Sequence, residues 1–146
     1  MQVHILRLAP GDDLRAALEA AFATLANTHG IAAACIVSAV GSLSQAVLRY
    51  ADKPGGTEVG GPLELLMLSG TLSPDGAHLH GSVADSQGQV KGGHLMPGCI
   101  VRTTAEVVIA LLPGWEFRRE LDVATGFREL AAQPRDAQGS PGDSGP

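Results

Sequence analysis

The sequence predicts an α+β protein in which one long helix covers one face of a mostly antiparallel sheet of about seven strands. Two observations support this fold class. Only residues 14–29 repeat apolar side chains at spacings of three and four, as an amphipathic helix does. The other apolar segments alternate with polar residues or run continuously, as strands do, and most of them follow one another without an intervening helix.

The first strand and the helix are marked by signals at their ends. Residues 1–8 alternate with apolar side chains on both faces, which is typical of a strand covered on both sides. Residues 10–13, Pro-Gly-Asp-Asp, provide a turn and an N-cap, and acidic side chains are favourable at the positive end of a helix dipole. Gly30 suits the left-handed position that ends a helix, so His29 is expected to be a capping residue.

Two segments are predicted as strands buried on both faces. Residues 31–40 are continuously apolar, and this strand is expected to end at residues 41–44, before an alternating segment over residues 45–50. Residues 63–72 form the second buried strand. Between them, residues 51–62 are rich in Gly, Pro, Asp and Lys, so we expect a mobile connection.

The C-terminal part is predicted to add short strands and a tail. Residues 107–112 are apolar and end at Pro-Gly, and residues 115–121 alternate once more. From residue 131 the chain has no Leu, Ile, Val or aromatic residue, so it cannot bury enough apolar surface to offset the entropy lost on ordering. We therefore expect one domain over residues 1–130 and a disordered tail over residues 131–146.

A histidine-containing segment is the most informative part of the sequence. His78 and His80 are two residues apart in an alternating segment, so both side chains leave the same face of a strand. Leu79 and Val83 then occupy the other face. The segment is followed by residues typical of a hairpin turn, so a returning strand is expected to lie beside it.

The length of the hairpin loop decides whether a third histidine joins the first two. A three-residue loop at residues 86–88 ends in a glycine suited to the left-handed conformation and pairs Asp85 with Gln89. His80 then faces His94, and directly opposed residues have Cβ atoms about 4.5 to 5.5 Å apart. A two-residue loop would put His94 on the opposite face. The Gly-Gly pair before His94 leaves room for a ligand, another chain or a bulge.

His78, His80 and His94 are therefore candidate metal ligands. Three neutral imidazoles with an open fourth position form the ligand set of an exchangeable or catalytic zinc site, and other divalent transition metals bind it too. The alternative is that they are three polar residues on a solvated sheet face. An H-x-H motif with one distant histidine is a weaker pattern than paired C-x-x-C motifs.

Composition and charge argue against several classes of protein. The net charge is −5 and the basic residues are scattered, which argues against direct binding to a phosphate backbone. Cys35 and Cys99 lie in apolar runs without a second cysteine nearby, so both are predicted to be buried thiols. The first residues lack the features of a signal peptide, and no stretch reaches the ~20 apolar residues that span a bilayer. We expect a soluble cytoplasmic protein.

One helix does not cover both faces of a sheet of this size. Residues 31–40 and 63–72 nevertheless carry apolar side chains on both faces. Packing against copies of the same chain would cover the second face, and homo-oligomers usually close by symmetry. The sequence therefore predicts a homo-oligomer.

Several short motifs follow one another along the chain. They are GDDL (11–14), GSL with LRY (41–43 and 48–50), ELLMLSGTL (64–72), DGAHLH (75–80), and GGHL with TAE (92–95 and 104–106). In this order they resemble the plants-and-prokaryotes-conserved (PPC) domain over roughly residues 2–122. The ordered set is much more specific than any one motif.

The resemblance implies a compact α+β domain that assembles as a homotrimer. In plant members this domain follows AT-hook segments that bind A·T-rich minor grooves, and it mediates assembly and contacts with protein partners. This chain contains no Arg-Gly-Arg-Pro core of an AT-hook, in agreement with its acidic charge. It does contain the histidine pattern of prokaryotic members, for which the resemblance implies a bound metal at His78, His80 and His94.

Two functions remain open. The first is a non-enzymatic trimeric module, associated with DNA or transcription factors through protein partners. The second is a zinc-dependent enzyme or small-molecule-binding protein that uses the three histidines. For the second, Glu64 and Glu106 are candidate acid–base groups and Arg49 and Arg102 are candidate anion-binding groups. No spacing in the sequence places any of these four near the metal.

Overall fold

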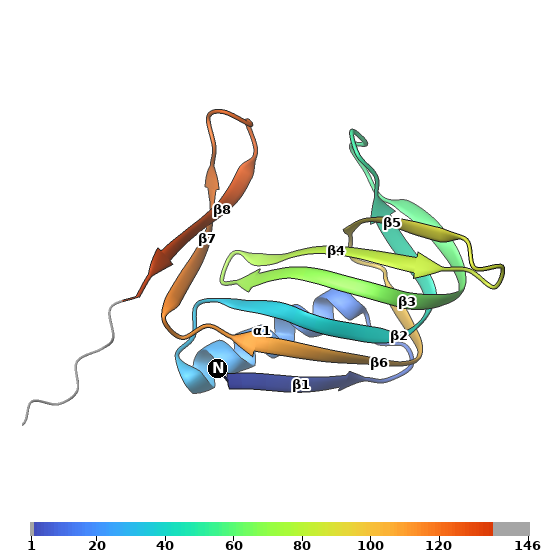
Figure 1. Cartoon of the computed structure of the whole chain (residues 1–146), viewed down its shortest axis with the longest axis horizontal. Coiled ribbons are helices and arrows are strands. Elements are labelled where there is room, and N and C mark those ends of the chain that lie inside the picture. Colours follow the sequence, from blue (N-terminus) through green and yellow to red (C-terminus); the bar gives the residue numbers. More distant parts are fainter. Residues whose placement is uncertain (1, 136–146) are drawn as a thin grey trace, which may run out of the picture.

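The computed structural model describes residues 2–135 and shows one helix packed against an antiparallel sheet (Figure 1). Six strands of these residues form one sheet in the order β1-β6-β2-β3-β4-β5, and each neighbouring pair is antiparallel. Two further strands form a separate hairpin. The predicted α+β class is confirmed. In chain order the elements are β1 (Gln2–Leu8), α1 (Leu14–His29), β2 (Ala34–Arg49), β3 (Thr57–Ser73), β4 (Gly76–Ala84), β5 (Val90–Leu95), β6 (Ile100–Leu111), β7 (Trp115–Leu121) and β8 (Arg128–Pro134).

The helix has the caps that the sequence predicts. The Asp13 carboxylate accepts a hydrogen bond from Ala16 N at 3.0 Å, and Gly30 ends the helix in the left-handed conformation with φ 63°. The apolar stripe of α1 is buried against β3, β4 and β6, with Leu18 fully buried. This packing supplies most of the stabilisation of the helix, because a helix of this length is marginal by itself in water. Within residues 2–135, no helix has the length and apolar character needed to cross a membrane.

The sheet face opposite to α1 remains open in the single chain. Ile5 is 63% exposed and Val37 is 56% exposed, although the neighbouring Ile36 is buried beneath the helix. A single chain therefore buries one face of residues 31–40 and 63–72, and the cover of the second face by another copy stays a prediction. We call this surface the open apolar face. Its large exposed side chains are Val3, Ile5, Val37, Val40, Leu66 and Met67.

β2 and β3 are longer than the sequence predicts. The expected end of the strand at residues 41–44 is wrong, because β2 continues through these residues with irregular pairing to β6 and β3. A Cβ atom at Gly41 would overlap the carbonyl oxygen of Thr104, so this glycine permits a close approach of strands and not a turn. β3 begins at Thr57, so residues 57–62 of the expected mobile connection belong to this strand, and residues 57–60 pair with β2.

The sheet curls until its last strand returns to β2. β5 pairs with β4 and also with the end of β2, where Leu48 lies opposite Leu95 and Arg49 lies opposite His94. A Cβ atom at Gly93 would lie 2.7 Å from the carbonyl oxygen of Arg49. Side chains do not tolerate such a contact, so the glycine is required for this approach. The room expected at the backbone of Gly93 is therefore filled by another strand of the same chain.

The β7–β8 hairpin projects away from the main sheet (Figure 1). β8 extends across the predicted domain boundary at residue 130, and its last residue, Pro134, pairs with Trp115. The prediction of disorder is therefore wrong for residues 131–134. Composition suggested disorder because these residues bury little surface, but the backbone hydrogen bonds to β7 stabilise them as a strand. Arg135 N also donates a hydrogen bond to Gly114 O at 2.9 Å, and residues 136–146 of the predicted tail lie outside the described part of the chain.

Candidate metal centre

β4 and β5 form the predicted histidine hairpin. Asp85 N donates a hydrogen bond to Gln89 O at 3.1 Å, and Gly88 adopts the left-handed conformation with φ 76°. The Asp85 carboxylate also accepts a hydrogen bond from Gln89 N at 2.9 Å, which stabilises the turn. The loop therefore has three residues, and His80 lies opposite His94 as predicted.

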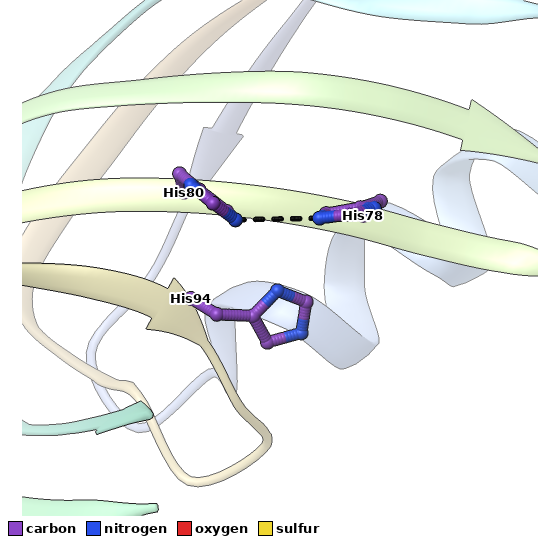
Figure 2. Close-up of side chains that lie close together, drawn as sticks. All are labelled: His78, His80 and His94. Carbon is purple, nitrogen blue, oxygen red and sulfur yellow. Dashed lines mark hydrogen bonds between the residues drawn. The ribbon is translucent and has the colours of Figure 1, made fainter. Parts of the chain in front are cut away.

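The three histidines form a compact cluster (Figure 2). Nε2 of His78 lies 3.3 Å from Nε2 of His80, and the potential ligand nitrogens of all three residues lie within 4.8 Å of one another. Two nitrogens that each lie about 2.0 to 2.1 Å from one tetrahedral zinc ion are about 3.4 Å apart. His78 and His80 therefore already have the separation that two ligands of one ion need. The His94 ring completes the triangle, with its centroid 5.0 Å from that of His78 and 5.5 Å from that of His80.

Nδ1 of His94 shows that the cluster fits a metal ion. This atom is buried, and among the described residues it has no hydrogen-bond partner. Figure 2 shows the His94 ring nitrogen nearest the side-chain stem turned toward His78 and His80. A buried polar atom left without a partner costs about 1 to 3 kcal/mol. An ion bound by the three imidazoles would provide that partner, and imidazole nitrogen is a preferred ligand of divalent zinc, copper and nickel.

Burial and nearby positive charge favour the neutral form of two of the imidazoles, His78 and His94. Burial lowers the pKa of His94 to about 4, and the neighbouring His78 and the Arg49 guanidinium add to this effect. Burial also lowers the pKa of His78, followed by the positive charge of Arg119. Neutral imidazole is the form that binds a metal. His78 and His94 therefore keep the metal-binding form to lower pH than an ordinary imidazole does.

Arg15 of the helix links the two histidine strands. Its guanidinium donates hydrogen bonds to Ala77 O at 2.8 Å and to Leu95 O at 3.0 Å. Ala77 directly precedes His78 and Leu95 directly follows His94, so this one side chain holds both strands at the cluster. Sequence reasoning missed Arg15, because the contacts join residues 62 and 80 positions apart and no local pattern indicates them.

Of the four other candidate residues, only Arg49 lies beside the histidines. It is paired with His94 across β2 and β5. Glu64, Glu106 and Arg102 instead line a separate hollow on the sheet. The acid–base candidates of the enzyme hypothesis are therefore not brought to the cluster.

Neither cysteine belongs to the cluster. Cys99 is fully buried as predicted, its sulfur accepts a hydrogen bond from Val47 N at 3.2 Å, and burial raises the pKa of its thiol. Cys35 is only partly buried, so the prediction of a buried thiol is not met there. It lies on the side of β2 that the helix does not cover.

Comparison with known proteins establishes the family. The model of the Plants and Prokaryotes Conserved domain matches residues 1–113, which is most of the chain. The chain belongs to this family. The PPC resemblance that the ordered motifs indicated is confirmed. A solved structure of a hypothetical protein from Salmonella enterica is similar to this PPC domain with 40% identity and a TM-score of 0.85, and the match covers 92% of this chain and 94% of that one.

Two further relatives bear on the site and on the length of the chain. The metal-containing protein AF0104 from Archaeoglobus fulgidus is 32% identical with a TM-score of 0.71, and the match covers 90% of this chain and 94% of that one. The bifunctional protein GlmU from a Synechococcus strain, JA-2-3B'a(2-13), is 51% identical over 134 residues. That match covers 92% of this chain but 21% of the relative. The chain thus spans about a fifth of the length of the curated relatives it matches.

Proposed function

We propose that this PPC domain binds one divalent transition-metal ion, such as zinc, through His78, His80 and His94. The observation that carries the proposal is the buried, unpartnered Nδ1 of His94 beside two imidazole nitrogens that lie 3.3 Å apart. The description of AF0104 as a metal-containing protein supports it, because that relative has the same fold and is 32% identical. The ion would be held at the surface of the sheet, with a coordination position left for water or a ligand.

Metal analysis of the untagged protein by mass spectrometry tests this proposal. We expect about one equivalent of a divalent transition metal per chain. His94→Ala should lose tight binding but stay folded, because the histidines lie on the sheet face opposite to the buried Leu79 and Val83. His29→Ala is the matched control, since His29 lies at the end of α1 and outside the cluster. Equal metal content in His94→Ala and wild type would contradict the proposal.

The second part of the proposal is that the domain works as a homotrimer. The open apolar face supports it, because contiguous exposed apolar surface of this kind marks an interface, and the PPC resemblance implies three copies. Directly paired residues on neighbouring strands point to the same side of a sheet. Cys35, on the side that the helix does not cover, pairs with Thr71, and Thr71 pairs with His78. The histidines and the open apolar face therefore lie on the same side of the sheet. A second copy that covers the open apolar face would therefore lie next to the histidine cluster.

Light scattering of dilute protein tests the assembly. We expect three times the chain mass of 14.9 kDa. Ile5→Asp should shift the protein toward the monomer, because it places a charge in the open apolar face. Val123→Asp is the control, since Val123 is 96% exposed in the loop of the β7–β8 hairpin. A stable wild-type monomer would remove this part of the proposal.

Within this proposal the domain is a non-enzymatic module. Protein partners mediate any association with DNA or transcription factors. The net charge of −5 per chain becomes −15 in a trimer, which opposes direct contact with a phosphate backbone. The enzyme alternative is weakened because Glu64 and Glu106 line a hollow that does not include the histidines. Small-molecule binding at the same metal is the second candidate function, and the position of Arg49 beside His94 favours it.

A further inference from the structure

A hollow of about 500 Å³ opens beside the histidine cluster. Its polar lining includes Arg15, Glu19, Arg49 and His94, and Pro54, Met96 and Pro97 supply apolar surface. The volume is in the range of pockets that bind small molecules. His94 belongs both to this hollow and to the histidine cluster. A ligand in the hollow would therefore contact one of the three candidate metal ligands.

The two arginines of the hollow differ in what they contact. Arg15 is fully engaged, since it donates to two backbone carbonyls and forms an ion pair with Glu19 at 3.1 Å. Arg49 is half-buried opposite His94, and within residues 2–135 no salt bridge or side-chain hydrogen bond involves its guanidinium. A charged group that is partly removed from water needs a partner. Arg49 therefore offers a free anion-binding group beside the metal.

We propose that this hollow binds a small monocarboxylate with an apolar body, held by the Arg49 guanidinium at the open position of the metal. The inference rests on the proposed metal site. A planar guanidinium matches a carboxylate with two parallel hydrogen bonds. The Arg15–Glu19 pair is neutral as a unit, so Arg49 leaves one unpaired positive side-chain charge, which suits a monoanion better than a phosphate dianion. Pro54 and Met96 would contact the apolar part of the ligand.

Cobalt-loaded protein provides the test, because visible absorption of bound Co²⁺ reports on its ligands. At constant ionic strength, propionate should change the wild-type spectrum saturably, and the neutral isostere propionamide should not. Arg49→Gln should weaken propionate binding by about tenfold or more, because it removes a charge-assisted hydrogen-bond donor. Arg49→Lys keeps the charge but loses the planar geometry, so its affinity should be intermediate. Arg102→Gln is the matched control, since Arg102 lines the separate hollow, and it should bind propionate like the wild type.

The possible outcomes separate the two proposals. Equal propionate affinity in wild type and Arg49→Gln would overturn the role of Arg49. A saturable response to inorganic phosphate, without one to propionate, would overturn the carboxylate class. Bound cobalt with a spectrum insensitive to both anions would refute the ligand site and leave the metal site standing. Wild-type protein that binds no cobalt would refute the metal site and the ligand site together.

Discussion

The metal affinity of the histidine cluster should fall less steeply in acid than that of three ordinary imidazoles. Protons compete with the metal, because only neutral imidazole is a ligand. An imidazole with the reference pKa of about 6.5 is about 3% neutral at pH 5, so lowering the pH from 7 to 5 weakens its binding about 25-fold. Burial lowers the pKa of His94 to about 4. About nine-tenths of His94 therefore stays neutral at pH 5. Its contribution to the metal affinity is almost the same at pH 5 as at pH 7.

The size of the effect can be expressed as a slope. Each ligand contributes to the change of log Kd per pH unit in proportion to its protonated fraction in the free protein. Three ordinary imidazoles would give a slope of about 2.7 near pH 5.5. His94 contributes almost nothing there, and His78 contributes less than a full proton because burial lowers its pKa as well. We therefore expect a slope below about two between pH 5 and 6.

Competition titration against a chromophoric zinc chelator measures this slope. The untagged protein is titrated at several pH values from 5 to 7, and the chelator is calibrated at each one because it binds protons too. A measured slope near 2.7 would show that His94 titrates as an ordinary imidazole. That result would refute the reasoning from burial, even if the three histidines bind the metal.

Three further predictions test the length of the β4–β5 loop, the close approach of β5 to β2 at Gly93, and the effect of the net charge on DNA binding. Deletion of Gln87 shortens the β4–β5 loop to two residues and places His94 on the other face of the strand, so metal analysis should find the ion lost, whereas Gln87→Ala should retain it. Gly93→Ala should lower the free energy of unfolding by about 1 to 3 kcal/mol in chemical denaturation, because its Cβ would lie 2.7 Å from the carbonyl oxygen of Arg49; Gly60→Ala has open space around its Cβ and should change stability little. Fluorescence anisotropy at physiological salt should detect no submicromolar binding of the isolated chain to duplex DNA, and tight binding would contradict the argument from net charge.

The sequence by itself determined the elements that depend on local periodicity and turn chemistry. The period of two places His78 and His80 on one face, and the three-residue loop before Gln89 brings His94 opposite His80. These relations span few residues and follow from strand geometry, so they needed no tertiary information. The helix was predictable for the same reason, since its cap at Asp13 and its apolar stripe are local patterns.

The local patterns failed where long-range pairing overrides them. Gly41 suggested the end of a strand, yet it lies inside β2. A glycine is needed there because the backbone of Thr104 in β6 approaches it closely. Residues 131–134 lack apolar side chains, yet they form a strand because β7 supplies hydrogen-bond partners. In both cases the partner strand is distant in sequence, so composition alone did not indicate it.

Only the tertiary structure decided what surrounds the histidines. It brings Arg15 from the helix to Ala77 and Leu95, and it brings Arg49 from the end of β2 to the side of His94. It also leaves Glu64 in a separate hollow. These positions depend on how far the sheet curls and where the helix crosses it. Curling and crossing are set by the packing of the whole core, and no spacing along the chain specifies them.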